Sequence, residues 1–156
     1  EPVCPVFASY HSDTENLNVQ VYNRCIGTRY CANNCPYSVR VYNWFDPYFP
    51  EPLEQQLNPD VTVRYRGIME KCTFCIQRIK RAEDAAQAEG RLLHDGDVVP
   101  ACVQACPTKV FTFGDRNDEH SEVAELARSR RGFHVLEDLG TDPSVVYLKG
   151  GESHAG

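Results

Sequence analysis

Short segments of alternating apolar and polar residues occur between cysteine-bearing loops in the first half of the chain. Residues 19–22 and 39–42 alternate in the manner of half-buried strands. Residues 76–89 are rich in Ala, Gln, Glu, Lys and Arg, which favour a helix, and Gly90 follows as a stop. A second helix is predicted from an N-cap at Ser121 toward Gly132. The pattern therefore predicts an α+β protein built from short elements.

A Cys-Pro pair recurs three times, and each pair precedes a β-prone segment. The β-prone segments are residues 6–7, 37–42 and 108–113. They predict a repeated unit in which a cysteine loop leads into a short strand. Further short strands are predicted at 133–136 and 145–148.

The Pro-rich stretch 46–52 interrupts this pattern, because Pro disfavours both helix and central strand. We therefore expect ferredoxin-like cluster lobes with short β-hairpins, an inserted helix, and a C-terminal helical and extended tail. The predicted domains are a partial lobe at 1–45 whose upstream ligands are missing, a linker at 46–66, a second lobe at 67–115 carrying the helix, and an extension at 116–156.

Net charge and hydropathy argue against two classes of protein, those that coat nucleic acid and those that span a membrane. The 156 residues include 16 Lys and Arg against 22 Asp and Glu, a net charge of −6, which is the wrong sign for coating nucleic acid. No apolar run is long enough to span a bilayer, so we expect membrane contact only through a partner. The chain begins without an initiator Met or a signal-like segment, which suggests part of a longer polypeptide.

The spacing of the eight cysteines favours iron-sulfur clusters. Bacterial-type ferredoxins use the run C-x2-C-x2-C-x3-C-P, and the segment from Cys25 through Cys31 to Cys35 matches it except at one ligand. Thr28 occupies the position of the second Cys, and a hydroxyl is a poor ligand for soft iron. The segment therefore predicts a 3Fe-4S cluster in place of a 4Fe-4S cluster.

A second group of cysteines follows the same template with a longer spacer. Cys72 and Cys75 are separated from Cys102 and Cys106 by a 26-residue insertion that carries the predicted helix. Such an insertion can loop out without moving the ligands. Cys4, followed by Pro5, is expected to close a further run whose first three ligands lie upstream.

Two other uses of these cysteines stay open. A disulfide framework is disfavoured because no secretion signal is visible. A zinc site could use Cys72, Cys75, Cys102 and Cys106, but it leaves the other four cysteines and all Cys-Pro pairs unexplained. The five histidines are scattered, and no phosphate loop or Ser/His/Asp arrangement occurs. We therefore expect an electron-transfer module without a catalytic residue of its own.

The cysteine motifs at 22–37, 70–75 and 99–107 resemble those of the four-cluster iron-sulfur subunits of molybdopterin oxidoreductases, such as polysulfide, dimethyl sulfoxide and nitrate reductases. The chain resembles in particular the iron-sulfur part of the large subunit of bacterial alternative complex III, a quinol-oxidising respiratory complex. Thr28 and the tail 131–148 favour that assignment.

This resemblance implies a ligand assignment. Cys4, Cys25 and Cys31 would hold the 3Fe-4S cluster. The remaining cysteines would hold 4Fe-4S clusters together with upstream residues: Cys35 in one cluster, Cys72, Cys75 and Cys102 in a second, and Cys106 in a third.

The resemblance also implies a respiratory role and a set of partners. Electrons would enter from quinol oxidised at an integral-membrane subunit and leave toward haem c subunits, with the 3Fe-4S cluster nearest the membrane. A molybdopterin-oxidoreductase-like domain would lie upstream or in a separate segment. The complex would sit peripherally on the bacterial inner membrane, at the periplasmic face. The alternatives are an iron-sulfur subunit of a molybdenum reductase and a zinc-binding structural module.

Overall fold

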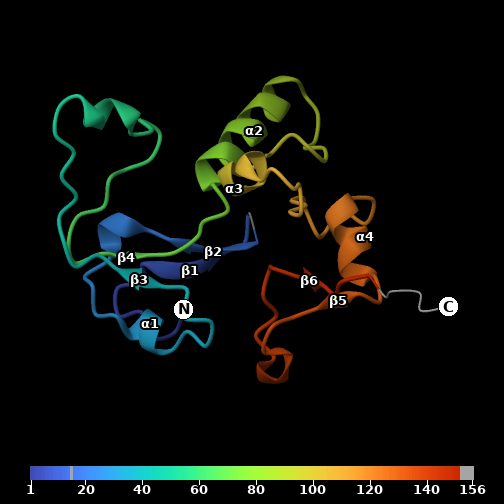
Figure 1. Cartoon of the computed structure of the whole chain (residues 1–156), viewed down its shortest axis with the longest axis horizontal. Helices are drawn as coiled ribbons and strands as arrows, with labels where there is room; N and C mark the ends of the chain where they lie inside the picture. Colours follow the sequence, from blue (N-terminus) through green and yellow to red (C-terminus); the bar gives the residue numbers. More distant parts are fainter. Residues whose placement is uncertain (15, 152–156) are drawn as a thin grey trace. The chain divides into compact units, whose positions relative to one another are not determined.

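The computed structural model describes residues 1–14 and 16–151. The chain divides into two compact units, Glu1–Gln77 and Arg78–Gly156 (Figure 1). The predicted lobes, linker and C-terminal extension stay a prediction, and residues 152–156 of that extension lie outside the described residues.

Two antiparallel hairpins form the β-structure of the first unit. Ser9 pairs with Gln20 in one hairpin, and Tyr42 pairs with Met69 in the other. The second pairing joins segments far apart in the sequence. It brings residues 69–70 back to the segment that directly follows the cysteine motif 25–35. The elements of this unit are β1 (Ser9–Ser12), β2 (Leu17–Gln20), α1 (Tyr30–Asn33), β3 (Val41–Tyr42) and β4 (Met69–Glu70), with 3₁₀ turns at Tyr22–Arg24 and Leu53–Gln56.

The second unit contains most of the helical structure. The long helix α2 begins at the end of the first unit, and Ile79 and Ala86 are its buried residues. It ends at Ala88, one residue before the predicted end at 89, and Gly90, the predicted stop, has a φ of +69° that suits the left-handed position after a helix. The elements are α2 (Ile76–Ala88), α3 (Ala101–Ala105), α4 (Glu122–Arg128), β5 (Gly132–Phe133) and β6 (Tyr147–Leu148), with a 3₁₀ turn at Glu137–Leu139.

The predicted N-cap of the second helix is confirmed. The Ser121 hydroxyl accepts a hydrogen bond from the Ala124 N–H at 3.2 Å and donates one to the Asp115 carbonyl at 2.6 Å. The helix ends at Arg128, earlier than predicted, because Gly132 belongs to the strand β5 that pairs with β6.

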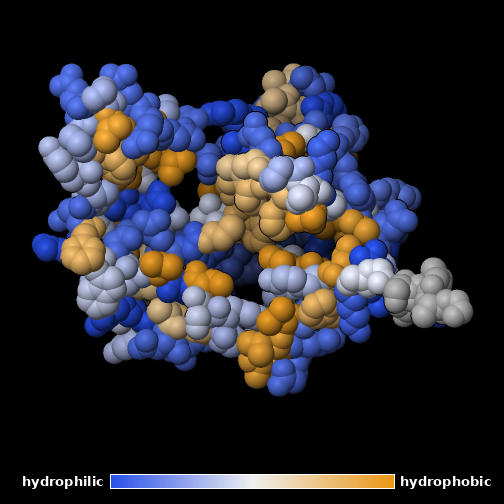
Figure 2. All heavy atoms as spheres, viewed as in Figure 1, coloured by the Kyte–Doolittle hydropathy of each residue, from blue (hydrophilic) through white to orange (hydrophobic). Residues whose placement is uncertain are grey.

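The hydrophobic core is small. Among the described residues, the buried apolar side chains are Ala8, Met69, Ile79, Ala86 and Ala124. Large apolar side chains reach the surface in both units (Figure 2). Units of this size bury too little apolar surface to be very stable alone, and small folds of this kind commonly depend on metal or disulfide cross-links. All eight cysteines are free thiols here.

The predicted α+β class with short hairpins is confirmed, but two of the predicted β-prone segments are wrong. Residues 6–7 and 108–113 form no strand. β-Branched and aromatic residues favour a strand only where a partner is available to pair, and these segments have none within the described β-sheets. None of the described helices has the length and apolar composition that crossing a bilayer requires.

Candidate metal centre

The three Cys-Pro pairs build the same backbone turn. In each copy the residue three positions after the Cys donates its N–H to the Cys carbonyl, at distances of 3.2 to 3.4 Å. That residue also has a positive φ, between 51° and 54°, in every copy. The Pro presets the backbone for the first turn position. The sequence repeat is therefore a structural repeat, although the turn and not a following strand is what its copies share. The residues at the third position are Phe7, Ser38 and Lys109.

Two of these turns direct backbone N–H groups at the sulfur of their cysteine. The Ala8 N–H donates to Cys4 Sγ at 3.2 Å. Burial raises the pKa of the Cys4 thiol, and the backbone N–H groups of residues 6–9 together lower it by more, so its pKa lies below the ordinary value. Such a nest of N–H groups stabilises negative charge. Since the thiolate is the form that binds metal, the turn prepares Cys4 as a ligand.

The turn at Cys106 has the same electrostatic character. The Thr108 hydroxyl lies 3.4 Å from the Cys106 sulfur. That hydroxyl and the backbone N–H groups of residues 108–110 lower the pKa of the Cys106 thiol. Two of the three Cys-Pro cysteines are therefore stabilised as thiolates by local groups.

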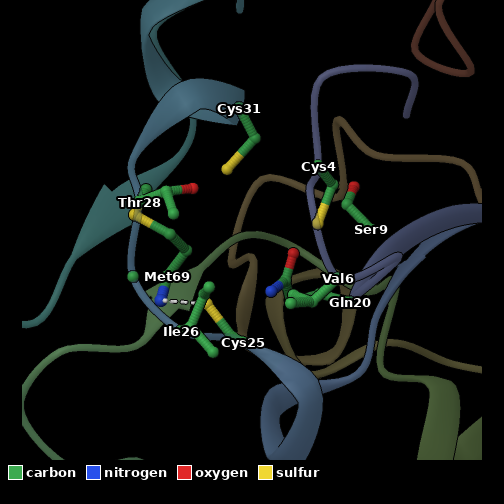
Figure 3. Close-up of a pocket in the computed structure, with 10 residues that line it drawn as sticks. Cys4, Val6, Ser9, Gln20, Cys25, Ile26, Thr28, Cys31 and Met69 are labelled. Carbon is green, nitrogen blue, oxygen red and sulfur yellow. Dashed lines mark hydrogen bonds between the residues drawn. The ribbon is translucent and has the colours of Figure 1, made fainter.

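Cys4, Cys25 and Cys31 line one pocket, together with Thr28. Figure 3 shows the three sulfur atoms facing a common space, with the Thr28 side chain beside it. The remaining lining residues are Val6, Ser9, Gln20, Ile26, Gly27 and Met69. Cys35 is not among the residues that line this pocket.

The loop from Cys25 to Cys31 has its shape because of one glycine. Gly27 has a φ of +70°, and a Cβ added there would lie 2.1 Å from the Gly67 carbonyl oxygen. The loop therefore passes against the segment that leads into β4, where only a glycine fits. β4 in turn presents the Met69 N–H to Cys25 Sγ at 3.4 Å.

Charged side chains hold this segment in place. Arg64 forms an ion pair with Glu70 at 2.7 Å and lies over the Tyr22 ring, 4.5 Å from its centroid. The Asn43 amide donates to the same carboxyl group at 2.5 Å. Burial raises the pKa of Glu70, but these two hydrogen bonds lower it by more, so the carboxylate form is favoured.

A cation stands over two neighbouring aromatic rings. The Arg29 guanidinium stands 5.3 Å from the Tyr42 ring centroid and 5.1 Å from that of Trp44. Arg29 itself has a φ of +63° and forms the N-cap of α1, the short helix that carries Cys31. These cation-π contacts stabilise an uncommon backbone conformation at the start of that helix.

Each unit contains two cysteines of the later motif. In the first unit the Phe74 N–H donates to Cys72 Sγ at 3.4 Å, and Phe74 and Cys75 both have positive φ values, of 53° and 56°. In the second unit Cys102 lies on α3, and Cys106 is the C-cap residue directly after the end of that helix. Two successive residues in the left-handed region thus separate the Cys72 loop from the start of α2.

Lys71 lies directly beside Cys72. Its ammonium group donates to the Cys72 carbonyl at 2.9 Å and to the Asn18 carbonyl. Burial lowers the pKa of Lys71 to about 8, and the nearby Arg40 also lowers it, while Cys72 opposes them. A positive side chain is therefore held against the backbone of the cysteine loop.

These features fit iron-sulfur clusters. Three thiols face one space, apolar side chains surround it, and backbone N–H groups are directed at the sulfurs, which are the protein contributions that cluster sites use. Within the described residues, no three Cys, His, Asp or Glu side chains lie close enough together to hold one metal ion directly. Thiolates on one zinc would stand about 4 Å apart, given Zn–S bonds of about 2.3 Å, whereas a cluster interposes several atoms between its ligands.

The fold and the cysteine sites together define an iron-sulfur protein of ferredoxin type. Comparison with known families agrees, because residues 24–110 match the 4Fe-4S dicluster domain (Fer4_7). The chain belongs to this family, and 4Fe-4S clusters are its cofactors.

Several known proteins are similar over nearly the whole chain. The menaquinone reductase iron-sulfur cluster-binding subunit of Nitratidesulfovibrio vulgaris is 50% identical, over 94% of this chain and 58% of its own length. A putative iron-sulfur subunit of dimethyl sulfoxide reductase from Halobacterium salinarum is 36% identical, over 95% and 49%. The Hdr-like menaquinol oxidoreductase iron-sulfur subunit 1 of Archaeoglobus fulgidus is 38% identical, over 96% and 52%. The chain thus spans about half the length of these relatives.

The sequence did not indicate the residues that complete the pocket. Ser9, Gln20 and Met69 lie on β1, β2 and β4, and they reach the site only through strand pairing. The alternation of residues 19–22 predicted a strand, but it gave no sign that Gln20 would face a cysteine cluster.

Proposed function

We propose that this chain is an electron-transfer iron-sulfur module of a membrane-associated, quinol-oxidising respiratory complex. The observation that supports the proposal most strongly is the shared pocket of Cys4, Cys25, Cys31 and Thr28. It places a hydroxyl beside three thiols, as the ferredoxin template with one missing cysteine requires.

In this proposal Cys4, Cys25 and Cys31 hold a 3Fe-4S cluster, a group that accepts and releases one electron at a time. The three thiolates bind it, and Thr28 leaves the fourth corner without a sulfur ligand. Val6, Ile26 and Met69 surround the site with apolar side chains. The N–H groups of Ala8 and Met69 compensate part of the thiolate charge.

The other cysteines serve 4Fe-4S clusters. Together with upstream cysteines, Cys35 binds one cluster, Cys72, Cys75 and Cys102 bind a second, and Cys106 binds a third. Lys71, whose charged group bonds the Cys72 carbonyl, would favour electron uptake there. Distances between successive clusters, and not bond making, then determine the path of the electron.

The relatives support one part of the wider complex. One is named a menaquinone reductase subunit and another a menaquinol oxidoreductase subunit, which supports a quinone or quinol as the redox partner. The quinol-oxidising direction rests on the resemblance to alternative complex III. We propose an integral-membrane quinol-binding partner, haem c subunits as acceptors, and a molybdopterin-oxidoreductase-like segment, as in alternative complex III. The module would lie peripherally on the bacterial inner membrane, at its periplasmic face.

A molybdenum reductase is the second candidate, favoured by the likeness to the iron-sulfur subunit of a dimethyl sulfoxide reductase. The two candidates differ in the parent complex and not in this chain. Bound pterin with reductase turnover in the purified complex supports the molybdenum reductase, whereas quinol oxidation coupled to cytochrome reduction without pterin supports the alternative complex III arrangement.

The decisive test of the module is electron paramagnetic resonance of the native complex, with iron, acid-labile sulfide and zinc analysis. The proposal predicts a 3Fe-4S signal in the oxidised complex that disappears on reduction while 4Fe-4S signals develop. A complex that contains zinc, no labile sulfide and no signal at any potential would replace it with a zinc-binding structural module.

A further inference from the structure

Gln20 lines the cysteine pocket with part of its hydrogen-bonding capacity unused. It is the last residue of β2, stands opposite Ser9, and is only 7% exposed. Among the described residues, its Oε1 atom is buried and has no hydrogen-bond partner. Leaving a buried amide oxygen unpaired is unfavourable, so such groups are rare unless something else occupies the site.

The carboxamide points into the pocket. Figure 3 shows the end of the Gln20 side chain directed to the space that the sulfurs of Cys4, Cys25 and Cys31 face. Of the glutamines that the structure describes, Gln20 alone lines this pocket.

Ser9, the other polar residue from the hairpin, is already engaged. Its hydroxyl accepts a hydrogen bond from Arg40 at 3.0 Å and lies 3.4 Å from Asn18 Oδ1. Arg40 also donates to Asn18 Oδ1 at 2.7 Å, which closes the network. Of the two polar side chains from β1 and β2 that line the pocket, Gln20 is therefore the one available to bond the group that the three cysteines hold.

We propose that Gln20 donates an N–H hydrogen bond to a sulfur atom of the group held by Cys4, Cys25 and Cys31, and thereby raises its reduction potential. The inference rests on the proposed function. Sulfide and thiolate sulfurs only accept hydrogen bonds, so the carboxamide turns its NH₂ group toward them. The two ends of an amide are nearly identical in shape, and this rotation requires no further room.

The direction of the effect follows from charge. Reduction adds one electron, forms and breaks no bond, and leaves both amide protons on Gln20. The reduced state carries more negative charge on sulfur, so a hydrogen-bond donor stabilises it more than the oxidised state. Removing the donor therefore makes reduction less favourable.

The test is a potentiometric titration of the native complex, followed by the 3Fe-4S resonance, with dithionite as reductant. Gln20→Met keeps the length of the side chain and removes the donor. At the wild-type midpoint potential, the ratio of reduced to oxidised cluster is one. At that same potential we expect the ratio in Gln20→Met to be about tenfold lower, which corresponds to a midpoint potential lowered by about 59 mV for one electron. Gln56→Met makes the same change at an exposed position and should leave the midpoint in place.

An unchanged midpoint in Gln20→Met, with the signal intact, overturns the inference while leaving the proposed function standing. A wild-type complex without any three-iron signal overturns the proposed function itself. The two failures are therefore distinguishable in one set of samples.

A second measurement covers the case in which Gln20→Met does not assemble its cluster. Wild-type complex is labelled with ¹⁵N in glutamine side chains only, and pulsed electron paramagnetic resonance records nitrogen coupled to the cluster. A ¹⁵N coupling supports the inference, because no other described glutamine lines the pocket. The absence of any coupling overturns it.

Discussion

Gly27→Ala is expected to empty the site of Cys4, Cys25 and Cys31 while leaving the rest of the protein folded. The added Cβ would stand 2.1 Å from the Gly67 carbonyl oxygen and 3.1 Å from the Tyr42 ring. Ordinary van der Waals contact between carbon and oxygen needs more than about 3 Å, so the two backbone segments must separate by about 1 Å. Because the Gly67 segment leads into β4, that shift also moves the Met69 N–H away from Cys25.

Two costs add in this variant. A non-glycine residue at positive φ costs about 1–2 kcal/mol. Overpacking of a well-fitted contact costs about a further 1–3 kcal/mol, as it does in protein cores. The sum, roughly 2–5 kcal/mol, is a large fraction of the stability of a small unit.

Gly90→Ala separates these two costs. Gly90 has nearly the same φ, +69°, but a Cβ there would meet nothing within 4 Å. This variant therefore carries the backbone strain alone and should keep its full complement of clusters.

The assay is iron content per complex together with the amplitude of the oxidised 3Fe-4S resonance. Gly27→Ala should lose most of this signal and about three irons, while Gly90→Ala stays at the wild-type value. If the two variants retain equal signals, close approach at Gly27 does not shape the site, and the structural reasoning is refuted.

Three further variants test other parts of the account. Thr28→Cys supplies the missing sulfur ligand, so the 3Fe-4S resonance should disappear from the oxidised complex and iron content should rise by one; an unchanged cluster type would show that spacing does not select three irons. Met69→Ala removes a side chain that is only 2% exposed, and it should cost about 2–5 kcal/mol in unfolding free energy, measured by urea denaturation, while preserving the backbone N–H bond to Cys25. Ser121→Ala removes the cap of α4 and should lower the unfolding free energy by about 1 kcal/mol; Ser121→Thr keeps a hydroxyl that both accepts and donates and should recover most of it, and equal loss in both would contradict the capping role.

The cysteine spacing made the site partly predictable from sequence. The template places Cys25 and Cys31 in one motif with a gap at Thr28, and the structure brings these three residues to one pocket with Cys4. The assignment of individual ligands to individual clusters stays a prediction. It depends on residues that other segments supply.

Which β-prone segments pair as strands, and the place of Gln20 in the pocket, could not be predicted from the sequence, for a physical reason. A Cys-Pro pair determines a local turn, and that turn recurs in all three copies. Whether a strand follows depends on a partner, which residues 41–42 find at 69–70 and residues 108–113 do not find among the described strands. Likewise Gln20 becomes a pocket residue because β2 pairs with β1, a contact that no local pattern encodes.

Iron-edge anomalous diffraction from crystals of the native complex tests the central claim most directly. The account predicts three iron positions in the pocket, bonded to the sulfurs of Cys4, Cys25 and Cys31, and none bonded to the Thr28 hydroxyl. A single zinc in the pocket, or a fourth iron held at Thr28, would contradict it.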